Sequence, residues 1–92
     1  MRILIAEDDA VTRRVLQRAV EQLGHEALVA GDGLDAWQQL QQETVDVVLS
    51  DWMMPGIDGG ELCRRVRAAV DRPYVYFIFL SILDDLDHAL VG

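Results

Sequence analysis

Residues 45–59 read V-D-V-V-L-S-D-W-M-M-P-G-I-D-G, and this stretch decides the fold of the 92-residue chain. Its first part, Val45 to Ser50, is an apolar run of strand length that ends at Asp51. The following residues, 52–60, contain Pro55 and three glycines, which predicts a loop. Asp51 is therefore a carboxylate placed directly after a buried strand, where functional side chains of α/β proteins often lie.

Strand and helix patterns alternate on both sides of this stretch. Apolar runs over residues 2–6, 25–30 and 74–80 predict three further strands. Amphipathic patterns predict helices after the first strand, over residues 34–43, near residues 62–70, and over the start of a fourth helix at 84–91. The first of these helices carries one apolar stripe, made of Val11, Val15, Leu16, Ala19, Val20 and Leu23. This alternation predicts one α/β domain over residues 1–92, with a parallel sheet and right-handed crossovers.

The charge and composition exclude several classes of protein. The net charge of −8 argues against binding nucleic acid through its phosphates. No apolar run approaches the length that spans a bilayer, so we expect no membrane segment. The single cysteine, Cys63, allows no internal disulfide and favours a cytoplasmic location. All eight basic residues are arginines, and the chain contains no lysine.

Polar side chains gather at the ends of the predicted strands. Glu7, Asp8 and Asp9 follow the first strand, Asp51 follows the third, and Ser81 follows the fourth. If these three strands are neighbours in a parallel sheet, their carboxyl ends meet at one edge, where ligands bind. Clustered carboxylates repel one another, and Mg²⁺, which prefers oxygen ligands, would relieve that repulsion. Each residue alone has a simpler interpretation, and Asp9 is expected to be a helix N-cap.

Three segments together resemble the receiver domain of bacterial two-component response regulators. The most specific is residues 45–59, which is similar to the segment that carries the family's phosphoacceptor aspartate. The other two are I-L-I-A-E-D-D-A-V-T-R-R, residues 3–14, and F-I-F-L-S, residues 77–81. The resemblance runs from residue 2 to residue 92 and implies a flavodoxin-like, three-layer α/β fold with sheet order 2-1-3-4.

The resemblance also implies a role for each polar residue. Asp51 would accept a phosphoryl group from a histidine kinase or phosphotransfer protein. Glu7, Asp8, Asp51 and the backbone carbonyl of Met53 would hold Mg²⁺, and Ser81 would contact the phosphoryl group and act as a switch. The chain would then be a signalling phosphoprotein and not an enzyme.

The chain departs from the family pattern at its end. The family continues with a fifth strand, which ends in a lysine that pairs with the phosphoryl group, and a last helix, and we expect this chain to lack both. The absence of lysine removes one of the positive charges that would hold the phosphoryl group. Asp51 remains the predicted phosphoacceptor.

Two other functions are alternatives to this one. The chain could be a truncated receiver that is impaired in phosphorylation and works mainly by self-association. The fourth strand would lie at a sheet edge, and its apolar, uncharged sequence invites a homodimer through that strand or through exchange of elements. A phosphohydrolase with an aspartate nucleophile is disfavoured, because the position two residues after Asp51 is Met53 and not a second acid.

Overall fold

The computed structural model describes residues 1–69 and 72–80. In chain order the elements are β1 (Arg2–Ala6), α1 (Ala10–Gln22), β2 (Glu26–Ala30), α2 (Gly33–Gln42), β3 (Val47–Ser50), α3 (Gly59–Ala68) and β4 (Tyr76–Phe79). The predicted site residue Ser81 and the predicted helix over 84–91 lie outside the described residues. Among the residues that are described, no helix has the length and apolar character to cross a bilayer.

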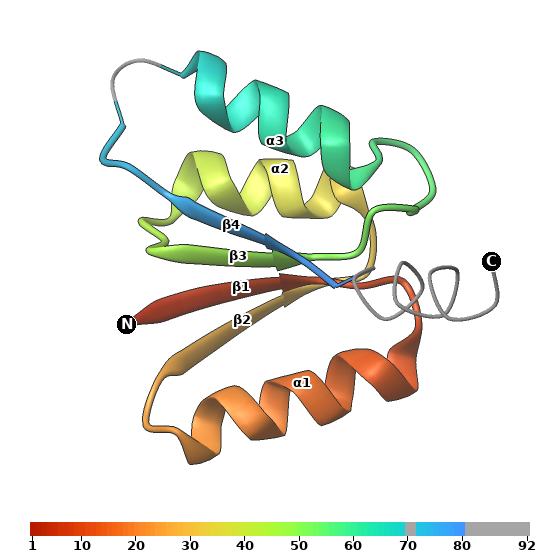
Figure 1. Ribbon diagram of the computed structural model, residues 1–92, viewed down its shortest axis with the longest axis vertical. Coiled ribbons are helices and arrows are strands. Elements are labelled where there is room, and N and C mark those ends of the chain that lie inside the picture. The colour runs from red at the N-terminus through yellow and green to blue at the C-terminus, as the bar shows by residue number, and fades with distance from the viewer. Residues whose placement is uncertain (70–71, 81–92) are drawn as a thin grey trace, which may run out of the picture.

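The four strands form one parallel sheet with the order β2-β1-β3-β4. Helix α1 lies on one face of this sheet, and α2 and α3 lie together on the other (Figure 1). The predicted order and the three-layer α/β fold are confirmed. The predicted strands were slightly too long, since β2 begins at Glu26, β3 at Val47 and β4 at Tyr76.

The larger part of the core lies between the sheet and the pair α2 and α3. Leu4, Val48 and Leu62 have no exposed surface there. The other buried apolar residues of this cluster are Ala6, Ala30, Ala36, Leu40, Val45, Met54, Val66 and Val75. Trp37 packs against the same cluster from α2. Burial of this apolar surface is the main source of stability for so short a chain.

Only part of the apolar stripe on helix α1 is buried. Only Val20 is buried on this helix, and Leu16 packs beside it. Val11, Val15 and Leu23 are 72%, 62% and 74% exposed. The reason is that α1 contacts mainly β2 and β1, so one side of its stripe has no strand beneath it. A sequence pattern gives the direction of an apolar stripe but not the width that the neighbouring layer covers.

The helix ends follow the sequence closely. Asp9 accepts a hydrogen bond from the backbone N–H of Thr12 at 2.9 Å and caps α1, as predicted. Asp58 caps α3 in the same way through the N–H of Glu61 at 2.8 Å. Gly24 ends α1 with a φ of 86°, which is the left-handed conformation that glycine adopts without strain.

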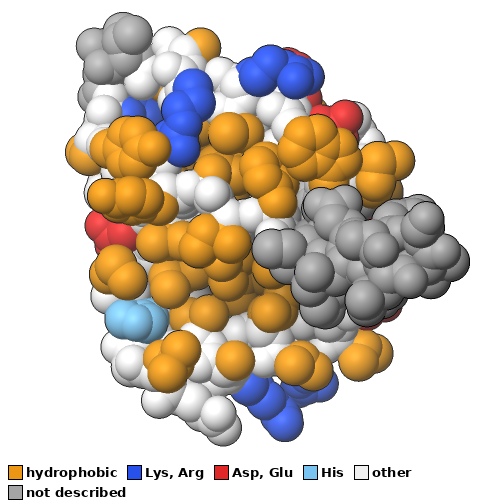
Figure 2. Space-filling model, viewed as in Figure 1, with side chains coloured by type: hydrophobic (Ala, Val, Ile, Leu, Met, Phe, Trp, Pro, Cys, Tyr) orange, Lys and Arg blue, Asp and Glu red, His pale blue; other side chains and the backbone are white. Residues whose placement is uncertain are grey.

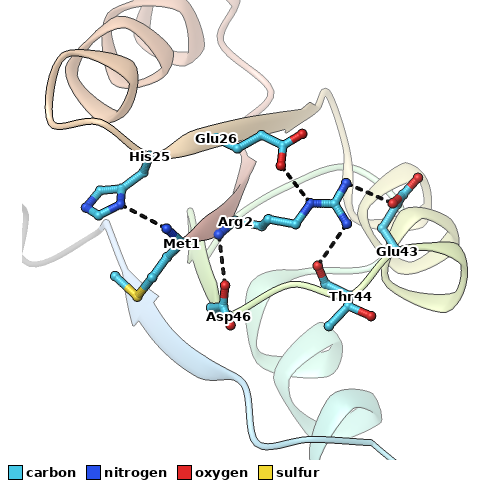
Figure 3. Close-up of polar contacts among 7 residues, drawn as sticks. All are labelled: Met1, Arg2, His25, Glu26, Glu43, Thr44 and Asp46. Atoms are coloured by element: carbon cyan, nitrogen blue, oxygen red, sulfur yellow. Dashed lines mark hydrogen bonds and ion pairs between the residues drawn. The ribbon is translucent and has the colours of Figure 1, made fainter.

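Arg2 links the segments at the amino ends of the strands through hydrogen bonds and ion pairs (Figure 3). Its guanidinium pairs with Glu26 on β2 and with Glu43 after α2, both at 2.9 Å. It also donates to the carbonyl of Thr44, and its backbone N–H donates to Asp46 at 2.8 Å. These groups are partly exposed, so their net contribution to stability is small. They lie at the edge of the sheet opposite the acidic residues that follow β1 and β3.

Candidate functional site

The carboxyl ends of β1 and β3 lie side by side. Ala6 is paired with Ser50 in the parallel register, so Glu7 and Asp51 follow at the same level. The backbone N–H of Asp51 donates to the carbonyl of Ala6 at 3.0 Å. On the other side of β1, the N–H of Glu7 donates to the carbonyl of Ala30 at 3.1 Å. Both acidic residues are therefore attached directly to the sheet.

Three of the predicted site residues come together at this edge. One carboxylate oxygen from each of Glu7, Asp8 and Asp51 lies within 4.8 Å of the other two. Glu7 is buried, Asp51 is half-buried and Asp8 is exposed, so the group opens to solvent on one side. Three carboxylates at this spacing, one of them exposed to solvent, fit the oxygen ligands and partial hydration of Mg²⁺. Their individual roles remain predictions.

Glu7 is the most constrained of the three carboxylates. It is only 5% exposed, and burial raises the pKa of its carboxyl above the usual value. The hydrogen bond that Glu7 Oε1 accepts from the backbone N–H of Asp9, at 3.0 Å, opposes that rise. The negative charges of Asp51 and Asp8 raise the pKa further. Ionised Glu7 is therefore disfavoured in the folded chain unless a cation lies nearby.

Replacing Glu7 with glutamine tests this electrostatic cost. Because the pKa of Glu7 is higher in the folded chain than in the unfolded chain, protonation of Glu7 favours folding. This contribution is complete below the unfolded-state pKa and is lost as pH rises through the folded-state pKa. In EDTA at pH 7 we expect Glu7→Gln to have a higher free energy of unfolding than the wild type, and the difference to disappear in acid. Urea unfolding between pH 4 and pH 8 measures it.

Added Mg²⁺ provides the second arm of this experiment. It should stabilise the wild type more than Glu7→Gln, because glutamine cannot offer a charged ligand. A wild-type chain that is as stable as Glu7→Gln at every pH in EDTA would contradict the prediction.

The backbone around Asp51 is packed closely. The Ser50 hydroxyl, which is fully buried, donates to the Asp51 carbonyl at 2.8 Å. Gly59, the first residue of α3, lies against the same carbonyl, since a Cβ built on it would come within 2.3 Å of that oxygen. Trp52 is 46% exposed, and its ring lies 4.8 Å from the ring of Phe79 on β4. The residues next to Asp51 are thus fixed by β3, β4 and α3 together.

The structure says less about the other two predicted site residues, Met53 and Ser81. Met53 lies in the loop after Asp51 with its side chain 72% exposed, and the role of its carbonyl stays a prediction. Ser81 lies outside the described residues. Sequence reasoning missed Arg13, whose guanidinium reaches the Glu7 carbonyl, and Gly59. The sequence offered a hint only for Gly59, because a glycine directly after Asp58, a residue that can cap a helix, marks a place where the chain can pack closely.

Comparison with known proteins agrees with this geometry. The family model described as the response regulator receiver domain matches residues 3–91. The transcriptional regulatory protein AfsQ1 of Streptomyces coelicolor is 34% identical over 85 residues, which cover 92% of this chain and 37% of that protein. A chemotaxis protein CheY homolog of Campylobacter jejuni is 39% identical over 70 residues, which cover 74% of this chain and 54% of that protein. The chain therefore spans roughly a third to a half of these relatives.

A solved structure gives the same result for the fold. The receiver domain of the sensor histidine kinase PA1611 from Pseudomonas aeruginosa PAO1 superposes with a TM-score of 0.78 at 28% identity. The alignment covers 85% of this chain and 64% of that one, and that structure is described with a magnesium ion coordinated in its active site cleft. From the sheet order, the acidic group at its carboxyl edge and the match over residues 3–91, the chain belongs to the response regulator receiver domain family.

Proposed function

We propose that this chain is a phosphoacceptor in two-component signalling and that Asp51 accepts the phosphoryl group. The observation that carries the proposal is the grouping of Glu7, Asp8 and Asp51 within 4.8 Å at the carboxyl edge of the sheet. In this proposal the three carboxylates and the carbonyl of Met53 hold Mg²⁺. The magnesium ion described in the related receiver domain supports that choice of metal.

The proposed reaction is a displacement at phosphorus. An oxygen of the Asp51 carboxylate forms a bond to the phosphorus, the bond from phosphorus to the donor breaks, and the donor keeps the electron pair. When bound, Mg²⁺ neutralises negative charge on the transferred group. Glu7 and Asp8 hold the negative charge that binds the ion, and the backbone contacts of Asp51 keep its carboxylate at the edge of the sheet. The chain is then the acceptor and not an enzyme acting on a separate substrate.

The proposed partner is a histidine kinase or a phosphotransfer protein of the cytoplasm. The surface of α1 beside the acidic group supports this partner. Val11 and Val15 are exposed one turn apart, and they line a shallow hollow with Ala10, Arg14 and Arg18. An exposed apolar pair flanked by arginines offers a partner both apolar contact and charge.

Mass spectrometry tests the acceptor proposal directly. The 92-residue chain is incubated with Mg²⁺ and acetyl phosphate, and its intact mass is measured with and without EDTA. We expect one phosphoryl adduct that forms only with Mg²⁺ and is lost at alkaline pH, as an acyl phosphate is. A folded chain that binds Mg²⁺ but forms no adduct would overturn the acceptor role.

Self-association is a second candidate function, and strand β4 favours it. Among the described residues β4 pairs with β3 alone, so it forms an edge of the sheet. Tyr74, Tyr76 and Ile78 are 66%, 64% and 50% exposed along this segment. Hydrophobic side chains spread over the middle of the face shown in Figure 2, which includes this side of the sheet.

The backbone of β4 is arranged for pairing with another strand. The N–H of Tyr76 donates to the carbonyl of Asp46, just before β3, and the N–H of Leu80 donates to the carbonyl of Ser50, at the end of β3. Because the backbone groups of alternate residues point to the same side of a strand, those of Phe77 and Phe79 point outward. The outward carbonyl of Val75 is already taken by Arg67, at 2.6 Å. A second copy could add its own β4 antiparallel to this one, about a two-fold axis at Ile78. Phe77 would then pair with the partner's Phe79, and the outward N–H and C=O groups of Phe77 and Phe79 would all be hydrogen-bonded.

Sedimentation velocity at micromolar concentration tests this second function. We expect a dimer for the wild type and a monomer for Ile78→Lys, because a charge on an edge strand opposes pairing. Val15→Lys is the matched control, since Val15 is also exposed and apolar but lies on α1. It should leave the dimer intact. A monomeric wild type, or dissociation by both variants alike, would exclude dimerisation through β4.

A further inference from the structure

Arg13 connects α1 to the turn that carries the acidic residues. It lies on α1 with its side chain half-buried, and its Nη1 donates to the backbone carbonyl of Glu7 at 2.8 Å. The same nitrogen lies beside Gly31, where an added Cβ would be 3.5 Å away. The guanidinium therefore fills the space between the turn after β1 and the turn after β2.

The turn formed by Glu7, Asp8 and Asp9 is held at several points. The N–H of Glu7 is bound to Ala30 on β2, and its carbonyl is bound to Arg13. The Glu7 carboxylate accepts the N–H of Asp9, which closes the turn around Asp8. Arg13 thus fixes the peptide group that joins Glu7 to Asp8, and that peptide sets the direction in which the exposed Asp8 carboxylate points.

Repulsion among the three carboxylates gives such an anchor something to oppose. Three carboxylates within 4.8 Å repel one another, and Asp8 is the only one of them that is exposed and free to swing away. A turn that relaxes outward would separate Asp8 from Glu7 and Asp51. The anchor on the Glu7 carbonyl opposes that movement from behind, without competing with the carboxylates for a metal ion.

We propose that Arg13 is a positioning residue for the acidic group: through the Glu7 carbonyl it holds Asp8 in place and so sets the affinity of the group for Mg²⁺. The inference rests on the proposed Mg²⁺ site and deepens it. Groups that orient metal ligands typically change metal affinity by about 10-fold to 100-fold when they are removed.

The direction in which the Mg²⁺ affinity changes distinguishes a positioning role of Arg13 from a purely electrostatic one. Removing a positive charge near three carboxylates should, by electrostatics alone, strengthen the binding of Mg²⁺. Loss of positioning should weaken it. Arg13→Met removes the hydrogen-bond donor while keeping an unbranched side chain, and Arg14→Met removes the same charge from an exposed neighbour on the same helix.

Isothermal titration calorimetry of the 92-residue chain with Mg²⁺ decides between these effects. We expect the dissociation constant of Arg13→Met to rise about 10-fold over the wild type and that of Arg14→Met to stay equal or fall. Arg13→Lys keeps the charge with a different reach and should lie between the wild type and Arg13→Met. Urea unfolding in EDTA verifies that each variant is folded.

Each outcome bears on the proposal. If Arg13→Met binds Mg²⁺ as tightly as the wild type, or more tightly, the positioning role is wrong. If Arg13→Met does not fold, Arg13→Lys takes its place, and a dissociation constant equal to that of the wild type overturns the role. If the wild type itself does not bind Mg²⁺, the proposed metal site fails and the role of Arg13 fails with it.

Discussion

Asp51→Asn is expected to leave the chain folded, to increase its stability without Mg²⁺ and to abolish the phosphoryl adduct. Asparagine has nearly the same shape as aspartate, so the backbone bonds to Ala6 and Ser50 remain. It removes one of the charges that raise the pKa of Glu7, and the repulsion within the group falls accordingly. The amide is not a nucleophile under these conditions, so phosphoryl incorporation should fall to background.

Three measurements check this expectation on the same samples. Intact mass after treatment with Mg²⁺ and acetyl phosphate should show an adduct for the wild type only. Urea unfolding in EDTA should give Asp51→Asn a higher free energy of unfolding than the wild type. Mg²⁺ at 100 times its dissociation constant should stabilise the wild type by about 2.7 kcal/mol and stabilise Asp51→Asn less.

Glu21→Gln is the matched control for these measurements. It removes one negative charge from an exposed position near the end of α1, far along the chain from the acidic group. It should form the phosphoryl adduct as the wild type does. In EDTA its free energy of unfolding should rise only by the small amount that follows from removing one negative charge from the chain. An adduct on Asp51→Asn equal to that on the wild type would show that another residue accepts the phosphoryl group.

The position of the acidic group was predicted from two general rules together with the resemblance to receiver domains. Apolar runs locate the strands, and parallel strands bring their carboxyl ends to one edge of the sheet. Glu7, Asp8 and Asp51 follow directly from those rules once β1 and β3 are neighbours. The resemblance to receiver domains supplied that neighbour relation, which periodicity alone does not specify.

What the sequence did not predict depends on contacts between distant segments. Which residues of the α1 stripe are exposed, here Val11 and Val15, depends on which strands α1 covers, and no pattern within α1 contains that information. Arg13 is one of several arginines on the same helix, and only the folded turn shows that it reaches the Glu7 carbonyl. Glu61 follows the capping Asp58 at the spacing of a capping box, but its carboxylate pairs with Arg64 and Arg65.

Gly59→Ala is expected to lower both the stability of the chain and its affinity for Mg²⁺. A Cβ on Gly59 would lie 2.3 Å from the carbonyl oxygen of Asp51 and 3.0 Å from the hydroxyl of Ser50. The nearest of these is a backbone atom, which cannot move without displacing Asp51 itself. Overpacking of this kind costs about 1–3 kcal/mol. A loss of 1 kcal/mol in a domain of this size lowers Tm by about 4–8 °C.

Gly60→Ala is a close control because it makes the same change one residue later in α3. Its Cβ would meet the ring of Trp52 at 3.2 Å, and that half-exposed side chain can move aside. The alanine also gains up to about 1 kcal/mol of helix propensity. We therefore expect Gly60→Ala to change the free energy of unfolding by less than about 1 kcal/mol and to bind Mg²⁺ like the wild type.

The comparison of the two alanine variants shows whether α3 positions Asp51. Urea unfolding gives the stability of each, and calorimetric titration gives the Mg²⁺ dissociation constant at a temperature where both are folded. If Gly59→Ala loses stability and Mg²⁺ affinity together while Gly60→Ala keeps both, the start of α3 holds Asp51 in the acidic group. If the two variants bind Mg²⁺ equally well, the close approach of Gly59 to Asp51 affects packing only, and the geometry of the group depends on β1 and β3 alone.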